Sequence, residues 1–182
     1  LLPEYPQVFG SYNVCLQRQI FLELKGFDAK YRYPSGEDND LSYRLTKRGL
    51  SIHFVDKAKV DHFHPVSVRK YLKEQFRHGF WRAKIYREHF DKARGDDYTF
   101  WKDGLEIVLV YSFFILGSFA VFGVGTADFG AAFLLLVLFG LEIVFTARTV
   151  SLGWPQKFLF SGVLFLRSFA RGIGFLIGML QS

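Results

Sequence analysis

The stretch Gly36-Glu37-Asp38-Asn39-Asp40-Leu41-Ser42-Tyr43-Arg44-Leu45 places three carboxylates within four positions, at the start of a sequence with helical spacing. Leu41 and Leu45 lie four residues apart, which puts them on one face of a helix. Gly49 follows as a stop signal, because glycine is favoured just beyond the end of a helix. We therefore expect a helix over residues 38–48.

The acidic residues at the start of this expected helix have a structural and a chemical interpretation. With Ser35 as the N-cap, Glu37 and Asp38 fall in the first turn, where the helix dipole favours ionised carboxylates. Asp40 and Arg44 have the spacing of an ion pair on the helix surface. A carboxylate can also take a proton from a reacting hydroxyl, so three acids this close together indicate a site.

Two short segments after the helix are expected to be β-strands, and the second carries histidines. Residues 51–55 and 58–64 have strand-like composition and are separated by a turn at Asp56-Lys57. In the second strand His62 and His64 share one face, so their imidazoles can reach a common centre. Neutral imidazole is a metal ligand, but a functional metal site needs more than two ligands. A metal site and a structural role both stay open.

Residues 66–90 have the pattern of a basic amphipathic helix. Val68, Leu72, Phe76 and Phe80 recur every four residues, and seven lysines and arginines occupy much of the remaining surface. Such a helix either lies on a membrane surface with its apolar face inward or packs on the rest of its own domain.

Two unlike halves meet near Gly104. Residues 1–104 hold 19 of the 23 Lys and Arg and 14 of the 17 Asp and Glu, a net charge of +5, whereas residues 105–182 hold four basic and three acidic residues. This shift predicts a polar domain followed by a membrane region. The basic excess suits anionic lipid or a phosphate-bearing substrate, and no recognised motif supports nucleic-acid binding.

The apolar half begins with two expected membrane spans. Residues 105–125 and 129–147 are each long enough to cross a hydrocarbon core of about 30 Å. They predict a hairpin whose basic flanks, together with the polar domain, lie on the cytoplasmic side of a multi-pass membrane protein.

The last apolar segment, residues 158–180, has two interpretations. Arg167 and Arg171 lie four residues apart and share one helical face, and charges in the middle of a bilayer are costly. The segment is either an interfacial amphipathic helix or a third span whose arginines face protein, water or Glu142. In the second case three glycines allow close helix packing, namely Gly172, Gly174 and Gly178.

Four landmarks carry a family resemblance: Gly10-Ser11-Tyr12-Asn13 with Gly26-Phe27-Asp28, the 36–45 stretch, His62-Phe63-His64-Pro65, and Gln75-Phe76-Arg77-His78-Gly79. Together they resemble the C-terminal half of the catalytic domain of family 2 glycosyltransferases, the inverting GT-A type. The apolar segments resemble the membrane anchors of many members. The resemblance implies an α/β fold, with a partial GT-A domain in residues 1–104 and transmembrane or interfacial helices in residues 105–182.

The resemblance also implies the chemistry of the acidic residues. Asp38 corresponds to the general base, which deprotonates an acceptor hydroxyl as it attacks the anomeric carbon of a nucleotide-sugar with inversion. Glu37 and Asp40 would position Asp38, bind acceptor hydroxyls or pair with Arg44.

Further roles follow from the same resemblance. One of His62 and His64, with His64 favoured, corresponds to the imidazole that joins a manganese or magnesium ion on the donor diphosphate. The side chains expected to face the acceptor or the diphosphate are Gln75, Arg77, His78 and Asn13. The residues after Gln75 depart from the processive Gln-x-x-Arg-Trp pattern, which argues against a processive polymerase.

The expected activity is that of a hexosyl-type glycosyltransferase at the cytoplasmic membrane face. Its partners would be a nucleotide-sugar donor, a glycan or lipid-linked acceptor and membrane lipid. The nucleotide-binding half of the family, with its Asp-x-Asp-type motif, would precede Leu1, so the isolated chain is expected to be an inactive fragment. The single cysteine, Cys15, suits a reducing compartment.

Two other function classes stay open. One is a non-catalytic membrane-anchored interaction module, in which the acids and histidines are structural. The other is a channel or transporter component that uses Glu142, Arg167 and Arg171.

Overall fold

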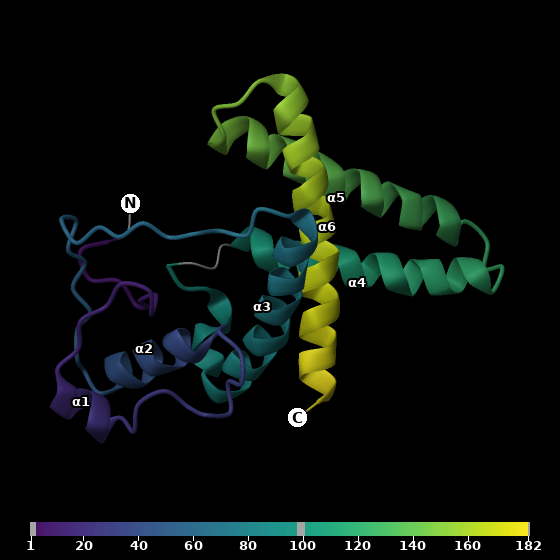
Figure 1. The fold of residues 1–182 in the computed structure, drawn as a ribbon. Helices are drawn as coiled ribbons and strands as arrows, with labels where there is room; N and C mark the ends of the chain where they lie inside the picture. The colour runs from purple at the N-terminus through teal and green to yellow at the C-terminus, as the bar shows by residue number, and fades with distance from the viewer. Residues whose placement is uncertain (1–2, 98–100, 182) are drawn as a thin grey trace.

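The computed structural model describes residues 3–97 and 101–181, which form a polar lobe (residues 3–97) beside three long helices (Figure 1). The polar lobe contains α1 (Arg18–Glu23), α2 (Glu37–Lys47), α3 (Val68–Glu88) and the 3-10 helix η1 (Phe90–Arg94). The long helices are α4 (Trp101–Val121), α5 (Ala127–Thr149) and α6 (Trp154–Leu180).

The helix predicted over residues 38–48 is confirmed as α2. Gly49 ends it as predicted, with a φ of 77°, in the left-handed region that glycine adopts without steric cost. The backbone N–H of Gly49 donates to the carbonyl of Thr46 over 3.0 Å, and that of Leu50 donates to Leu45 over 3.4 Å. These bonds satisfy carbonyls that the end of a helix leaves open.

The predicted N-cap is wrong by one residue. Gly36, with a φ of 94°, is the N-cap of α2, and a Cβ there would come within 2.9 Å of the side chain of Ile85. The backbone conformation therefore favours glycine, and a Cβ would also displace the end of the Ile85 side chain. The Ser35 hydroxyl instead lies 2.9 Å from Nδ1 of His78 on α3.

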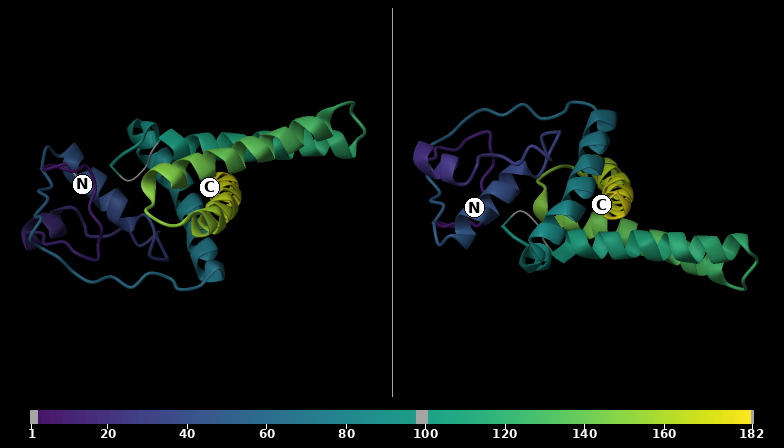
Figure 2. Two further views of the ribbon diagram at one scale, coloured as in Figure 1. Left: turned by 90° about the horizontal axis from the view of Figure 1, so that it is seen from above. Right: turned by 90° about the horizontal axis from the view of Figure 1, so that it is seen from below.

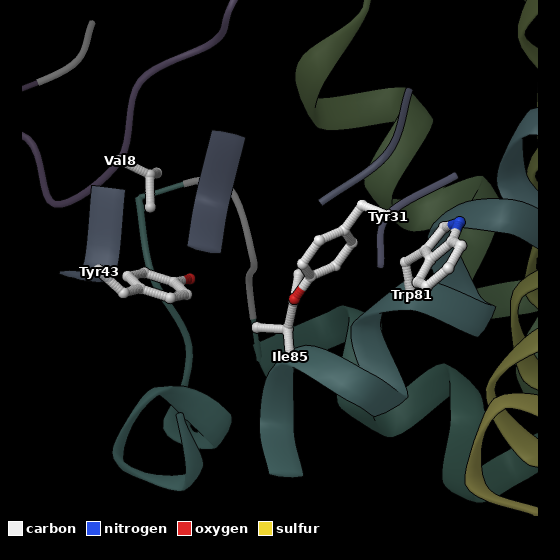
Figure 3. Packing of buried hydrophobic residues seen from close by; sticks show 5 residues of the cluster. All are labelled: Val8, Tyr31, Tyr43, Trp81 and Ile85. Carbon is white, nitrogen blue, oxygen red and sulfur yellow. The ribbon is translucent and has the colours of Figure 1, made fainter. Parts of the chain in front are cut away.

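Two small apolar clusters fix α2 within the polar lobe. The first joins α2 to α3 and consists of Val8, Tyr31, Tyr43, Trp81 and Ile85 (Figure 3). The second packs the predicted apolar face of α2 against the N-terminal segment and consists of Phe9, Leu24, Leu41 and Leu45. Tyr43 and Leu41 are almost fully buried, so both sides of α2 are anchored.

The predicted strands are not found. Residues 51–55 and 58–64 are irregular chain, and neither residues 3–97 nor residues 101–181 contain a strand. The backbone N–H of Phe54 donates to the carbonyl of Glu4 over 2.9 Å, but a strand needs a ladder of such bonds to a neighbour. The α/β fold class is therefore not confirmed, and the part of the chain described is helical and irregular.

Glycines bring α3 and α6 into close contact. A Cβ on Gly174 would lie 2.1 Å from the carbonyl oxygen of Phe76, and one on Gly178 would lie 2.3 Å from that of Phe80. A Cβ on Gly79 of α3 would likewise come too close to the backbone of α6. Close packing by Gly174 and Gly178 was expected for a third membrane span, but their partner is the basic amphipathic helix.

Gly174→Leu is expected to push α3 and α6 apart and to lower the thermal unfolding temperature in detergent micelles. A side chain forced into this contact has no space, and overpacking costs about 1–3 kcal/mol. The matched control is Gly162→Leu in the same helix, where a Cβ meets no atom within 4 Å. Equal unfolding temperatures for the two variants would contradict this packing.

Helices α4 and α5 form an antiparallel hairpin, and α6 crosses the hairpin near its open end instead of running beside it (Figures 1 and 2). At the crossing, the hydroxyl of Tyr111 on α4 donates to the carbonyl of Gly172 over 2.9 Å. Each of the three helices is long and apolar enough to cross a membrane.

Candidate active site

A turn at residues 10–13 lies between the acidic residues and the histidines. The backbone N–H of Ser11 donates to Oδ2 of Asp38 over 3.3 Å, and the ring of Tyr12 packs edge-on against that of His62 with centroids 5.1 Å apart. The side chain of Asn13 donates to the carbonyl of Ala58 over 2.8 Å. The turn thus connects the start of α2 with the histidine segment.

Asp38 is half-buried at the N-terminal end of α2. Its Oδ1 accepts from the backbone N–H of Asn39 over 2.9 Å. These contacts leave room for another proton, because a carboxylate has about four acceptor positions. Glu37 beside it accepts from the backbone N–H of Ser35 over 2.7 Å, which fixes the loop that leads into the helix.

A surface hollow of about 330 Å³ lies next to these acids. Glu37 and Ser11 lie on its wall, and Arg32 and Tyr33 close another part of it. It therefore offers a carboxylate, a guanidinium and aromatic surface, which are groups that can bind the hydroxyls and the ring faces of a sugar.

The Gln75–Gly79 segment of α3 turns different side chains to different partners. The guanidinium of Arg77 lies 4.6 Å from the centre of the Tyr33 ring, so Arg77 supports a wall of the hollow. His78 holds Ser35. Gln75 is buried and accepts from Nε of Arg171 on α6 over 2.7 Å. Arg77 and His78 thus lie beside the loop before α2, whereas Gln75 points toward the long helices.

His78 is held in its neutral form. Although part of the side chain is exposed, desolvation of the ring and the charges of Arg171 and Arg82 lower the pKa of His78. At neutral pH an uncharged imidazole therefore faces the Ser35 hydroxyl.

The two predicted metal-binding histidines lie close together and are exposed. The ring centroids of His62 and His64 are 4.9 Å apart. Within residues 3–97 and 101–181 no third His, Cys, Asp or Glu forms a three-ligand group with them. Their arrangement fits a half-site, which could hold an ion only with ligands from the ion's own substrate or from elsewhere.

Asp40 lies buried in a cluster with Glu88 and His89, at the end of α3. Asp40, Glu88 and His89 bring ligand atoms within 4.8 Å of one another, as in a metal site. However, Arg44 binds Oδ2 of Asp40 over 2.7 Å, His89 Nε2 lies 2.9 Å from Oδ1, and Lys47 Nζ lies 3.1 Å from the other His89 nitrogen. A divalent cation would meet occupied oxygens and two positive neighbours, so this cluster does not fit a metal.

The pairing of Asp40 with Arg44 is the one of its three expected roles that the structure contains. Arg44 also donates to the backbone carbonyl of Gly26 over 2.8 Å and to that of Leu24. Asp40 thereby joins α2 to the loop after α1 and to the end of α3. These contacts connect three parts of the lobe through one carboxylate.

A buried charged network lies at the base of the hairpin; sequence reasoning had pointed to Glu142 and the two arginines of α6 but missed their partners on α4. Lys102 contacts Glu106 and lies 2.9 Å from both oxygens of Glu142, and Arg167 donates to Glu106 over 2.7 Å. Three cations and three carboxylates take part, namely Lys102, Arg167 and Arg171 with Asp103, Glu106 and Glu142. The i, i+4 spacing of Lys102 and Glu106 was the available signal.

The charged network continues to the Gln75–Gly79 segment of α3. Arg171 bonds Asp103 of α4 over 2.5 Å and Gln75 of α3 over 2.7 Å. In turn α3 carries His78, which holds the loop before α2. A continuous set of contacts therefore links the hairpin with the acidic end of α2.

Comparison with protein families found a similarity for most of the polar lobe. Residues 8–80 match the family model described as glycosyltransferase like family 2. This segment is similar to family 2 glycosyltransferases. Searches among curated proteins and among solved structures found no match.

The family 2-like segment contains the 10–13 turn, α2, the two histidines and the first half of α3. The resemblance found in the sequence is thereby confirmed. The roles assigned to single residues stay predictions, because a family match does not test them.

Proposed function

We propose that this chain contributes the acceptor side of a glycosyltransferase that moves a sugar from a nucleotide-sugar to an acceptor hydroxyl, with inversion, at the cytoplasmic membrane face. The observation that carries the proposal is the position of Asp38. In a family 2-like segment, this half-buried carboxylate lies at a helix N-terminus, beside a hollow lined by Glu37 and Ser11.

In the proposed reaction Asp38 takes the proton of the acceptor hydroxyl. The backbone N–H groups of Ser11 and Asn39 hold the carboxylate in place, so it can receive the proton without first reorienting. Glu37 and Arg32 in the hollow bind the acceptor's other hydroxyls. Arg77 and His78 fix the loop that forms one wall.

The proposed metal site is a half-site at His62 and His64. Because both imidazoles are exposed and adjacent, they fit two ligands to a manganese or magnesium ion that also binds the donor diphosphate. Such an ion neutralises the charge of the leaving diphosphate. We propose that the donor is held by a nucleotide-binding half outside residues 1–182, and that the isolated chain does not transfer sugar.

Asp38→Asn is expected to reduce sugar transfer by about 10²–10⁴-fold, the usual contribution of a general base. The assay measures transfer from a panel of labelled nucleotide-sugars by the chain joined to its natural upstream coding sequence, with the 182-residue chain in parallel. Donor binding, measured separately, is expected to stay unchanged. The matched control is Asp56→Asn in an exposed turn.

Near-normal transfer by Asp38→Asn would overturn the assignment of the base. Absence of transfer in the longer form, with every donor and acceptor class tried, would overturn the proposed function itself.

The double variant His62→Ala/His64→Ala is expected to raise the manganese concentration needed for half-maximal transfer by at least about 10–100-fold, the effect of losing even an outer-shell partner of a metal. The control is His53→Ala, an exposed histidine that packs against Tyr5 with ring centroids 5.4 Å apart. An unchanged manganese dependence would remove the two histidines from the metal site.

The two alternative functions predict different results. A non-catalytic interaction module predicts no transfer by any form of the protein. A transporter component predicts that ion or substrate flux depends on Glu142, Arg167 and Arg171. In the structure the charges of these residues are compensated within the buried network, which favours a structural role for them.

A further inference from the structure

The two faces of α6 have different surroundings. One face is buried against α3 and the hairpin and is lined by small residues, namely Ser161, Ser168, Gly172, Gly174 and Gly178. The other face carries an exposed apolar stripe, which consists of Leu159, Leu166, Ile173 and Leu180 at intervals of seven residues. This exposed stripe runs along the full length of the helix.

The contacts of α6 place its middle at the open end of the hairpin. Arg167 bonds Glu106 and Arg171 bonds Asp103, both in the first two turns of α4. Glu142, which lies in the last third of α5, is reached by the hydroxyl of Ser168 over 3.3 Å. If α4 and α5 cross a bilayer, the centre of α6 therefore lies where the hairpin enters it, not at the bilayer midplane.

The contact with α3 excludes a spanning arrangement on energetic grounds. The C-terminal half of α6 is tied to α3 by Gly174 and Gly178, and Arg87 of α3 donates to the carbonyl of Gly178 over 2.9 Å. A spanning α6 would draw the charged C-terminal half of α3 into hydrocarbon. Arginine and lysine side chains near the bilayer centre are strongly unfavourable.

The directions of the helices agree with this conclusion. In Figure 1 the polar lobe and α3 lie on one side of α6, and the closed end of the hairpin projects from the other side. Beyond Glu106, residues 107–121 of α4 continue as apolar helix over about 22 Å, and residues 122–124 add a short apolar turn, against about 30 Å for the hydrocarbon core. Each helix of the hairpin is long and apolar enough to cross a membrane, so the hairpin can serve as the crossing element without α6.

We infer that α6 lies along the membrane surface, with the exposed stripe in contact with the acyl chains of the lipid bilayer and α3 on its water side. Trp154, whose ring lies 5.5 Å from Nζ of Lys157, begins the helix with the aromatic and basic groups that favour the membrane interface. Because α6 is bound to the lipid surface and α3 packs on α6, α3 and the loop before α2 are held at a fixed distance from the membrane. This inference does not depend on sugar transfer.

The test measures the depth of single positions in the full chain. In a Cys15→Ser background, single cysteines at Leu159, Leu166, Ile173 and Leu180 carry a fluorophore, and the protein is placed in phosphatidylcholine–phosphatidylglycerol vesicles with lipids brominated at different acyl depths. All four positions are expected to be quenched by the same shallow bromines. Exposed positions on α4 are the control: Ile115 is expected to be the deepest, with Val108 shallower on the side of the polar lobe and Phe119 shallower on the side of the closed end.

A depth profile with Leu166 and Ile173 deeper than both Leu159 and Leu180 would overturn the inference, as would four unquenched positions.

A second measurement is independent of label effects. A surface α6 after a two-helix hairpin leaves the C-terminus on the same side as the polar lobe, so impermeant reagents should reach a C-terminal tag and Cys15 from one side. Labelling of the two from opposite sides would also overturn it.

Discussion

Asp40→Ala is expected to lower the free energy of unfolding of the polar lobe by about 3–5 kcal/mol, the usual cost of removing one partner of a buried ion pair. The Asp40 side chain is only 4% exposed and accepts from Arg44 and His89. Its loss leaves the Arg44 guanidinium without its counter-charge and frees the end of α3. The measurement is the thermal unfolding temperature of the purified chain in detergent micelles.

The control for this prediction is Asp91→Ala. Asp91 pairs with Lys47 over 3.2 Å, but both side chains are about half exposed, and pairs of this kind contribute little. Asp40→Leu/Arg44→Met, which removes both charges, is expected to be less destabilising than Asp40→Ala. An unfolding temperature for Asp40→Ala equal to that of Asp91→Ala would show that Asp40 does not hold the lobe.

The same residue predicts a dependence of stability on pH. Burial raises the pKa of Asp40, but hydrogen bonds from His89 and Arg44 and the charge of Arg44 outweigh it, so the net pKa is below its usual value. A lowered pKa in the folded state stabilises the protein above the unfolded value of about 3.9, and this stabilisation is lost as the pH falls through the folded value. Asp40→Ala should show a smaller loss of stability in acid than the unsubstituted chain.

Lys102→Met is expected to destabilise the junction of hairpin and α6 by a similar amount, about 3–5 kcal/mol. Lys102 is buried between Glu106 and Glu142, and its ammonium compensates both carboxylates. Without it, Glu106 keeps Arg167 as a partner, whereas Glu142 loses the cation that it is paired with in the structure. The expected result is a lower thermal unfolding temperature in detergent micelles and faster proteolysis between the polar lobe and the hairpin.

Two variants make the second prediction specific. Lys73→Met changes an exposed lysine of α3 in the same way and is expected to leave the unfolding temperature nearly unchanged. Lys102→Met/Glu142→Gln removes one negative charge with the positive one and is expected to recover part of the loss. If the double variant is no more stable than Lys102→Met, charge compensation is not what the network provides.

Helix positions were predictable because their signals are local. The four-residue spacing of Leu41 and Leu45 gave α2, and the repeat from Val68 to Phe80 gave most of α3. The prediction of strands at residues 51–55 and 58–64 was wrong because the signal for a strand is not local. A strand is stabilised by a partner, and the residues described supply this segment with a bond to Glu4 but no ladder.

In the candidate site, too, the residue types were predictable from the sequence, whereas their long-range contacts were not. The acids at the start of α2 and the two histidines were identifiable as chemistry-bearing residues, and the family match supports the class of protein to which they belong. That Asp40 is committed to Arg44 and His89 was not predictable, because His89 lies 49 residues away in the sequence. The contact of Gln75 with Arg171, 96 residues away, was likewise not predictable, and the ligand-binding role of Gln75 stays a prediction.

By itself the sequence determined the helices from α2 to α6 apart from η1, the apolar character of the second half and the resemblance of residues 8–80 to a glycosyltransferase, because composition, periodicity and motif are properties of neighbouring residues. Only the tertiary structure decided which helix the glycines of α6 pack against and how its arginines are neutralised. Both depend on contacts between segments some 60–100 residues apart, such as Arg167 with Glu106 and Gly174 with Phe76. No local pattern encodes a partner at that distance.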